Sequence, residues 1–292
     1  MSAVKEFAIQ LLVNPNWMAE ELQTSGHEVK HSYGLEVPLY LESDIWWMPQ
    51  EIATKICRSL DANTRPLPSF ESPGPKWLQR VNERFLQRQV TTITVSEVTE
   101  SKAKELGEGW WKAAEAKIDD FPAQLRSPEK VILDILEADL PPETILQFTS
   151  TTLDIKNEFR FVISGDTVKT GSLYLTKDKE GERTYYDGAN STSLQLKKAN
   201  DFAQEVVEAT AGPSSYVLDI AELNDGTYCV LEANPIWCSA WYGSDIEHFI
   251  EALRFSQEEG YSSAWQWEPD EYLKKKVSKQ RMLPFREALI VS

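Results

Sequence analysis

Two apolar runs in the last third of the chain constrain its fold more than any other feature. The runs SYVLDIAEL and TYCVLEANPIW are separated by Asn224, Asp225 and Gly226. Such a sequence favours a tight turn, so the pattern predicts an antiparallel hairpin. Counting outward from the turn places Asp219 opposite Glu232 to within one residue of register. The hairpin therefore carries two facing carboxylates on strands that otherwise read as buried.

The second strand adds an amide to this pair. Asn234 lies two residues after Glu232 and so projects from the same face. Two buried like charges repel unless a cation or a proton lies between them. Oxygen ligands favour Mg²⁺ over zinc, and Mg²⁺ usually shares its shell with nucleotide phosphates. The pattern predicts a magnesium–nucleotide site; alternatively, Asp219 faces solvent and Glu232 is a chance charge at a strand end.

Three basic residues are placed to meet phosphates. Lys112 lies inside the apolar strand WWKAA, where a lysine needs an anionic partner, and Lys117 follows where this strand enters a loop. Arg160, in the run EFRFV, points away from the face formed by its two phenylalanine neighbours. Lysine and arginine both bind phosphate. A simple ion pair with Glu158, on the same face, is the alternative for Arg160.

Two segments that precede these motifs in the chain predict helices. The run KWLQRVNERFLQRQV carries Arg80, Arg84 and Arg88 at a spacing of four, which is either a solvated face or a clamp for phosphate or carboxylate. The run TVSEVTESKAKELGEG begins with a capping-box pattern from Thr94 to Glu97.

The remaining segments give a mixed α and β pattern. Strands are predicted for FAIQLLV and ETILQFTS, and a second hairpin for NEFRFVIS followed by TVKTGSLYLT. Helices are predicted for PQEIATKICRSL, SPEKVILDILEAD, SLQLKKANDFAQEVVEATAG and SDIEHFIEALRFSQEEG, the last capped by Ser244.

Composition narrows the classes of function. The formal net charge of −16 repels a nucleic-acid backbone, so no nucleic-acid partner is expected. No apolar run approaches the roughly 20 residues that span a bilayer, so neither a membrane segment nor a membrane partner is expected, and the chain reads as cytoplasmic. The three cysteines lack the spacing of a zinc site.

In order and spacing, these segments resemble the ATP-grasp superfamily of carboxylate–amine ligases, in particular the branch named for two arginines and a lysine. Asp219, Glu232 and Asn234 resemble its metal-binding pattern, and WWKAAEAK resembles its lysine-bearing strand and the loop lysine that follows. NEFRFVISG and VKTGSLY resemble its Glu-x-Arg strand and the next strand. The resemblance extends over residues 76–245.

The resemblance implies an α+β and α/β architecture, the ATP-grasp fold, in which two α+β lobes enclose ATP. An N-terminal α/β pre-ATP-grasp domain would occupy residues 1–90, a small ATP-binding lobe 91–152, the lobe with the metal site 153–262, and a tail 263–292. The basic run LKKKVSKQR in that tail is either solvated or a flap over anionic ligands. Trp237 and Trp241 either pack in the core or line a substrate site.

The resemblance also implies roles for individual residues. Lys112 and Lys117 would contact phosphates, Asp154 would hold the ribose hydroxyls, and Asp219, Glu232 and Asn234 would bind one or two Mg²⁺ ions, which Mn²⁺ can replace; Gln147, Phe148 and Thr149 would form the hinge beside adenine. Many ligases of the superfamily carry an arginine two residues before the metal aspartate, where this chain has Val217. Arg160, also a nucleotide contact, and Lys169 are the catalytic candidates that remain.

The implied reaction joins a carboxylate and an amine, on small molecules or a peptide, through an acylphosphate that releases ADP and phosphate. The alternatives are a phosphotransferase with the same fold, or a catalytically silent nucleotide-binding scaffold. The three metal ligands and both lysines favour a catalyst. No Ser/His/Asp set is found, and chemistry of this kind needs none.

Overall fold

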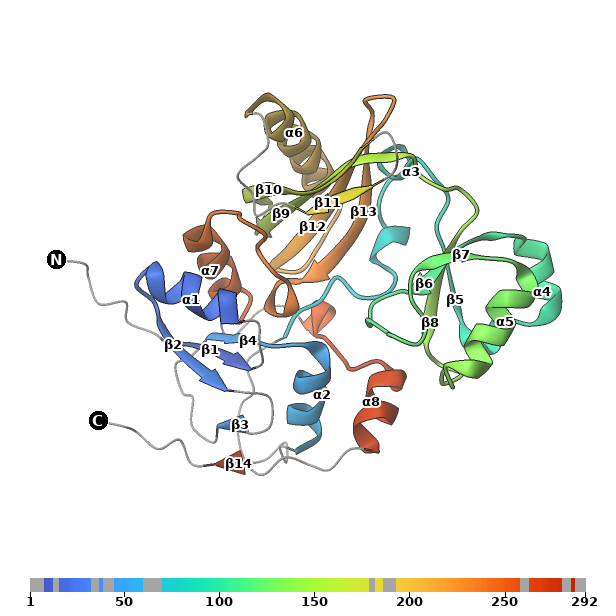
Figure 1. The fold of residues 1–292 in the computed structure, drawn as a ribbon, viewed down its shortest axis with the longest axis horizontal. Coiled ribbons are helices and arrows are strands. Elements are labelled where there is room, and N and C mark those ends of the chain that lie inside the picture. The colour runs from blue at the N-terminus through green and yellow to red at the C-terminus, as the bar shows by residue number, and fades with distance from the viewer. Residues whose placement is uncertain are drawn as a thin grey trace.

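The computed structural model describes residues 8–12, 16–32, 37–38, 45–59, 70–178, 182–185, 193–257, 263–279 and 285–286. These residues form an N-terminal unit, a small lobe and a large lobe (Figure 1). The two lobes are α+β, with antiparallel sheets, and the N-terminal unit is α/β. The predicted fold class is therefore confirmed.

The N-terminal unit is built on a three-stranded parallel sheet. Its strands lie in the order β2-β1-β4, and its elements are β1 (Ala8–Leu12), α1 (Asn16–Thr24), β2 (Glu28–Ser32), β3 (Val37–Pro38), β4 (Ile45–Trp47) and α2 (Gln50–Ser59). The C-terminal end of the chain returns to this unit. Helix α8 (Glu271–Ser278) packs against α2, and β14 (Phe285–Arg286) pairs with β3.

Where the structure describes it, the basic run at the C-terminus is part of a packed helix and not a free tail, with Lys274 and Lys279 exposed to solvent. Lys276 pairs with Glu51 of α2 at 3.0 Å, and Lys275 pairs with Asp139 of the small lobe at 2.6 Å. The two lysines are consecutive in α8 and project from different sides of it, one toward the small lobe and the other toward α2. The last two residues of the run lie outside the described residues.

The segment that joins the N-terminal unit to the lobes is not the predicted continuous helix. It forms a 3₁₀ turn, η1 (Trp77–Gln79), and a single helical turn, α3 (Glu83–Leu86). Asn82 interrupts the helix because its side chain accepts a hydrogen bond from the Arg84 amide, as an N-cap does. The arginine stripe expected on one helical face therefore does not exist.

The small lobe is a four-stranded sheet covered by two helices on one face. Its strands lie in the order β5-β8-β6-β7. Its elements are β5 (Thr91–Thr94), η2 (Val95–Glu97), α4 (Glu100–Leu106), β6 (Gly109–Ala113), β7 (Gln124–Arg126), α5 (Pro128–Glu137) and β8 (Ile145–Thr149). The capping box from Thr94 to Glu97 is present but closes only η2; Thr99 caps α4, so the prediction of one helix from Thr94 is wrong.

The large lobe is a five-stranded antiparallel sheet in the order β11-β10-β9-β12-β13. Its elements are β9 (Ile155–Ser164), β10 (Thr167–Lys177), β11 (Arg183–Tyr185), α6 (Ser193–Ala209), β12 (Ser215–Leu223), β13 (Tyr228–Pro235), η3 (Ile236–Cys238), α7 (Ile246–Phe255) and η4 (Ser263–Trp265). Both predicted hairpins are confirmed. Helix α7 is capped by Asp245, one residue later than predicted, while the Ser244 hydroxyl contacts that of Ser172.

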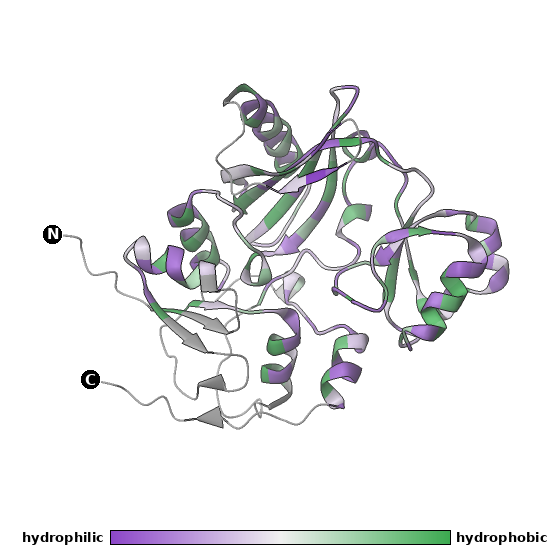
Figure 2. Cartoon of the chain, in the orientation of Figure 1, coloured by the Kyte–Doolittle hydropathy of each residue, from purple (hydrophilic) through white to green (hydrophobic). Residues whose placement is uncertain are grey.

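The two faces of the large sheet are covered differently, and this difference creates the site. Phe159, Phe161 and Ile220 face α6 and the joining segment in one apolar cluster. On the opposite face, Val162 and Val217 pack in a cluster that includes residues of α7. Figure 2 shows hydrophobic stretches in the strands of this sheet, interrupted by hydrophilic ones. Past the part that α7 covers, this same face carries charged side chains, among them Arg160 of β9 and Asp219 of β12.

Candidate active site

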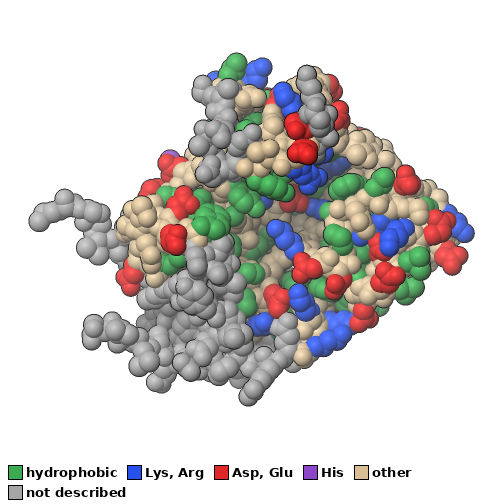
Figure 3. Space-filling model, viewed as in Figure 1, with side chains coloured by type: hydrophobic (Ala, Val, Ile, Leu, Met, Phe, Trp, Pro, Cys, Tyr) green, Lys and Arg blue, Asp and Glu red, His purple; other side chains and the backbone are tan. Residues whose placement is uncertain are grey.

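A hollow lies between the small and large lobes, and charged side chains of both signs gather around it (Figure 3). The small lobe turns one face of its sheet toward the helices, where Trp111 and Phe148 are buried. Lys112 and Gln147, which are opposite each other on β6 and β8, alternate with these residues and project from the other face. The sheet therefore presents the predicted phosphate lysine on the side away from its own helices.

The predicted carboxylate pair forms on the large lobe. Asp219 and Glu232 are direct partners in the β12–β13 ladder, and Asn234 pairs with Val217 two residues further on. A bulge follows the Asp219–Glu232 pair, because Ile220 is opposite Val230. The pairing predicted from the hairpin to within one residue is thus confirmed.

Arg160 binds Asp219 through two parallel hydrogen bonds. The guanidinium Nε donates to Asp219 Oδ1 at 2.8 Å, and Nη2 donates to Oδ2 at 2.7 Å. Both side chains are buried, and β9 places Arg160 directly opposite Asp219 on β12. Burial raises the pKa of Asp219 despite this arginine. Burial alone would lower the pKa of Arg160, but the Asp219 charge outweighs it and holds that pKa above its ordinary value.

Val217 occupies the position at which the resemblance would place an arginine. Val217, two residues before Asp219, is fully buried against the α7 side of the sheet. Arg160 reaches Asp219 from the neighbouring strand, so it brings a guanidinium to the same carboxylate. The ion pair of Arg160 is with Asp219 and not with Glu158, the alternative partner.

Lys112 forms an ion pair with Glu232 that joins the two lobes. Its Nζ donates to Glu232 Oε2, and the Asn234 amide donates to Oε1 of the same carboxylate at 2.9 Å. The charge of Lys112, opposed by burial, lowers the pKa of Glu232 to about 2. Glu232 is therefore ionised at neutral pH, and Lys112 is its partner in the ion pair.

The donor set of Asp219, Glu232 and Asn234 fits Mg²⁺ when the nucleotide completes the shell. Each Asp219 oxygen keeps a second lone pair beside its bond from Arg160, and Asn234 donates through nitrogen, which leaves its amide oxygen as an acceptor. Mg²⁺ typically takes only one or two carboxylates from a protein. Among the described residues there is no group of three or more His, Cys, Asp and Glu side chains suited to a metal. Two carboxylates and an amide thus suit a phosphate-bound Mg²⁺ better than a protein-only metal cage.

An aromatic pair beside Arg160 was not predicted. The rings of Tyr174 and Tyr242 are stacked at 5.1 Å, and the Arg160 guanidinium lies 4.7 Å from the centre of the Tyr242 ring. The Tyr174 hydroxyl donates to Glu158 at 2.5 Å. Tyr242 has φ 47°, a conformation that costs energy for a residue other than glycine. The strand pattern places Tyr174 near Arg160, but no sequence signal brings the Tyr242 loop to it.

The three residues predicted to form the hinge lie on β8, where the small lobe meets the large one. Gln147 and Thr149 are buried on the face that also carries Lys112. The Phe148 ring packs against Trp111 at 4.7 Å, on the opposite face. An added Cβ at Gly109 would lie 2.2 Å from that ring, which shows how tightly it is held. A side-chain contact of Phe148 with adenine is therefore excluded in this arrangement, and only its backbone can contribute.

Three residues predicted to contact ligands take no part in the Arg160–Asp219 and Lys112–Glu232 ion pairs. Asp154 is exposed and accepts a hydrogen bond from Asn224, so it holds the turn of the β12–β13 hairpin. Lys117 is exposed on the loop after β6. Lys169 is exposed in a bulge of β10 and forms no ion pair with any described residue. The structure therefore brings Arg160, and not Lys169, to the carboxylates.

Arg88 stabilises backbone next to the site, a role that the helical pattern of the sequence does not predict. It is buried and donates to the carbonyls of Leu86, Val230 and Leu231. Leu231 lies at the bulge immediately before Glu232. Arg88 thus anchors the irregular backbone that carries the site, and it is not a phosphate clamp.

The tryptophans after the metal motif belong to the core. Trp237 and Trp241 are buried and pack against Phe70 and Phe249 respectively. A role for either indole as an exposed wall of the substrate site is therefore excluded.

Two lobes with a lysine strand facing a carboxylate hairpin define an ATP-grasp protein. Residues 85–252, more than half of the chain, match the ATP-grasp domain of the R2-K clade, family 2, and the chain belongs to this family. No curated protein matches the chain.

Solved structures share the fold at low identity. A D-cycloserine synthetase is 13% identical with a TM-score of 0.52, covering 86% of this chain and all of its own. A D-alanine–D-alanine ligase from Bacillus anthracis is 12% identical with a TM-score of 0.50, covering 87% of this chain and 99% of its own. A carboxyaminoimidazole ribonucleotide synthase from Aspergillus clavatus, solved with ATP, is 12% identical with a TM-score of 0.50, covering 86% and 79%. Within the described residues, no helix is long and apolar enough to cross a bilayer.

Proposed function

We propose that the protein is an ATP-dependent ligase that joins a carboxylate to an amine and releases ADP and phosphate. One observation carries the proposal: Lys112 of the small lobe and Glu232 of the large lobe neutralise each other across the space between the lobes. These are the two charges that a magnesium–nucleotide complex would separate, because phosphate attracts the lysine and the metal attracts the carboxylate.

The remaining residues supply the charges that phosphoryl transfer needs. Mg²⁺ held by Asp219, Glu232 and Asn234 would neutralise charge on the β- and γ-phosphates. Arg160 would hold Asp219 in place and direct its free N–H toward the transferring group. Lys112 and Lys117 would bind phosphate oxygens, with adenine beside Gln147 and Thr149 and the ribose near Asp154.

The reaction would proceed in two steps. A substrate carboxylate oxygen attacks the γ-phosphorus, the bond to the β-phosphate oxygen breaks, and ADP leaves. The amine then attacks the carbonyl carbon of the acylphosphate, loses a proton and expels phosphate. Positioning and charge neutralisation suffice for both steps, which agrees with the absence of a nucleophilic side chain among these residues.

The test follows both labelled phosphates of ATP. ATP labelled on the α- and γ-phosphorus is incubated with Mg²⁺ and a panel of amino acids, and products are separated and analysed by mass spectrometry. We expect labelled ADP and phosphate in step with an amide. A stable phosphorylated product would instead identify a phosphotransferase, AMP would exclude the acylphosphate route, and no product would support a scaffold.

A further inference from the structure

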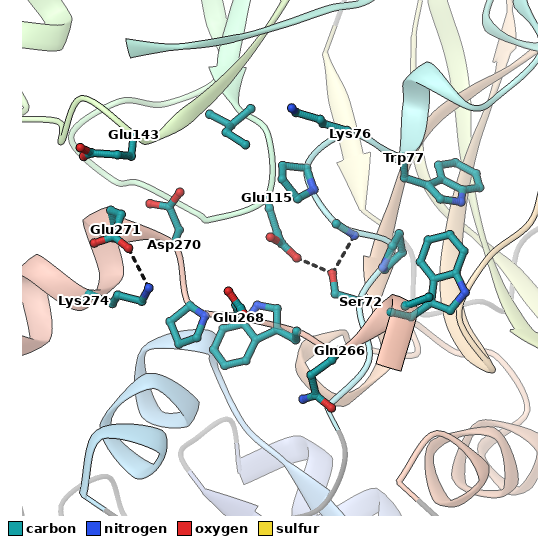
Figure 4. Close-up of a pocket in the computed structure, with 18 of the residues that line it drawn as sticks. Ser72, Lys76, Trp77, Glu115, Glu143, Gln266, Glu268, Asp270, Glu271 and Lys274 are labelled. Carbon is teal, nitrogen blue, oxygen red and sulfur yellow. Dashed lines mark hydrogen bonds and ion pairs between the residues drawn. The ribbon is translucent and has the colours of Figure 1, made fainter. Parts of the chain in front are cut away.

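A cavity of about 450 Å³ lies where the three bodies of the protein meet. It is bounded by the joining segment, the loop after β6 and the segment before α8, and we call it the junction cavity (Figure 4). Its lining includes Ser72, Trp77, Glu115, Trp265, Trp267 and Asp270. No residue of the magnesium–nucleotide site described above lines this cavity.

Glu115 is a mostly shielded carboxylate in this cavity that lacks a cationic partner. It accepts a hydrogen bond from the Ser72 hydroxyl, and it forms no ion pair with any described residue (Figure 4). Burial, together with the nearby charge of Asp270, raises the pKa of Glu115 to about 7. A carboxylate removed from water without a cation is costly, so this position is suited to a cation supplied by a ligand.

No other charged side chain that lines the cavity forms an ion pair with Glu115 in the part of the chain that the structure describes. Lys274 is paired with Glu271 at 2.7 Å, and the Arg80 guanidinium lies over the Trp265 ring at 4.7 Å. Glu143 and Glu268 also line the cavity, and neither forms an ion pair with a described residue. Lys76 is exposed at the edge. The cavity therefore offers more free carboxylates than free cations.

The walls indicate what the cation is attached to. Trp265 is only partly buried, and with the adjacent prolines it gives the cavity apolar sides; Trp77 and Trp267 also line the cavity but are almost wholly buried. Aromatic walls around a few polar groups are typical of small-molecule sites. A primary ammonium group on an apolar body matches both the carboxylates and these walls.

The junction cavity is close to the proposed reaction centre. Glu115 follows Lys112 by three residues, a length of chain that spans at most about 10 Å. Burial raises the pKa of the Cys238 thiol, and the charges of Lys117 and Glu115 also affect it, so this residue, four after Asn234, lies near both. A ligand in the cavity would thus lie beside the loop after β6, which follows Lys112 and carries Lys117.

We propose that the junction cavity binds the amine substrate of the ligase, and that Glu115 receives its ammonium group. The identity of this ligand as a substrate rests on the proposed function, whereas binding of an ammonium group does not. Nucleotide is not needed for binding, so the two ideas can be tested separately.

The binding test uses benzylamine, with benzyl alcohol as its neutral counterpart and benzoate as an anion, each titrated by calorimetry without ATP. We expect benzylamine to bind at least tenfold more tightly than either, and Glu115→Gln to weaken it about tenfold, as loss of one charge-assisted hydrogen bond does. Glu268→Lys, an exposed change that adds a competing ammonium, should also weaken it. The matched controls Glu137→Gln and Glu137→Lys, on the exposed face of α5, should leave it unchanged.

Equal affinity for benzylamine and benzyl alcohol, or benzylamine binding that neither cavity variant weakens, would overturn the proposal. Because Glu268→Lys alters only an exposed side chain, it remains informative if Glu115→Gln fails to fold. If the protein binds benzylamine but turns over no ATP, the proposed ligase function is wrong and the proposed ammonium site still stands. Turnover of ATP with an amine whose KM neither cavity variant alters would support the ligase and exclude the junction cavity as its amine site.

Discussion

Arg160 and Asp219 lie on neighbouring strands of the large lobe and are joined by two parallel hydrogen bonds of 2.8 and 2.7 Å. The fork fixes the carboxylate in one orientation, which an ammonium group on a flexible stem does not do. The contact is buried, so it is shielded from the screening that weakens surface ion pairs. The geometry of the proposed metal site therefore depends on a residue that is not itself a ligand.

Arg160→Lys should keep a positive charge near Asp219 but lose the fork. We expect a loss of about 1–3 kcal/mol in the free energy of unfolding, because one buried hydrogen bond to a charged group is broken. ATP turnover should fall at least tenfold. Urea denaturation and a phosphate-release assay measure the two effects, and Arg84→Lys, at an exposed position, is the control. Wild-type turnover in Arg160→Lys would show that the fork does not position the site.

Lys112→Ala should weaken ATP binding by about tenfold or more, the value of one charge-assisted hydrogen bond to phosphate. The variant also frees Glu232, whose pKa should rise from about 2 because the Lys112 charge is the main cause of its low value. Calorimetry with ATP and Mg²⁺ compares it with Lys198→Ala, a change on the exposed face of α6. If both variants bind ATP equally well, Lys112 is not a phosphate ligand.

Glu232→Gln tests whether Glu232 is needed to bind the metal without being needed for folding. The amide keeps the shape of the side chain but loses the charge that attracts Mg²⁺. We expect ATP turnover to be abolished while far-UV circular dichroism stays that of the wild type. Turnover at the wild-type rate would mean that the metal site lies elsewhere.

Arg88→Met tests the anchor of the bulge before Glu232. The change leaves the carbonyls of Leu86, Val230 and Leu231 without their shared donor. A buried acceptor without a partner costs about 1–3 kcal/mol, so we expect the free energy of unfolding to fall by at least that much. Urea denaturation beside Arg84→Met measures it. A loss no larger than that of the control would assign Arg88 no anchoring role.

The sequence predicts the parts of the site that lie within one hairpin and fails where distant segments meet. Asp219 and Glu232 are placed by a count from the turn, because antiparallel register follows from turn position. The Arg160–Asp219 contact also needs β9 to lie beside β12, and β10, β11 and α6 intervene in the chain. The continuous helix over Arg80, Arg84 and Arg88 is wrong because apolar spacing does not reveal the N-cap at Asn82.

Glu115 illustrates the same limit. Its neighbours Ser72 and Asp270 come from the joining segment and from the segment before α8, so nothing in the run WWKAAEAK shows that this carboxyl becomes shielded from water. The raised pKa of Glu115 in turn gives the protein a pH dependence that composition does not predict.

The free energy of unfolding should depend on pH through Glu115. Its pKa is about 7 in the folded protein and near 4.5 in the unfolded chain, so the folded state holds the proton more tightly. The carboxyl therefore costs no stability below about pH 4.5, and a penalty grows as the pH rises to about 7. At 1.36 kcal/mol per unit, the full penalty is about 3 kcal/mol. Glu115→Gln removes it, so the variant should gain stability relative to the wild type across this range.

Urea denaturation of both proteins between pH 4.5 and 8 measures this difference, and Glu137→Gln, on the exposed face of α5, is the control that should show no trend. A difference that stays constant with pH would mean that Glu115 titrates normally in the folded protein. Benzylamine adds a second measurement, because an ammonium bound to the ionised carboxylate stabilises the folded state by mass action. The stabilisation by benzylamine should increase toward pH 8 in the wild type, and in Glu115→Gln it should be smaller and lack this increase.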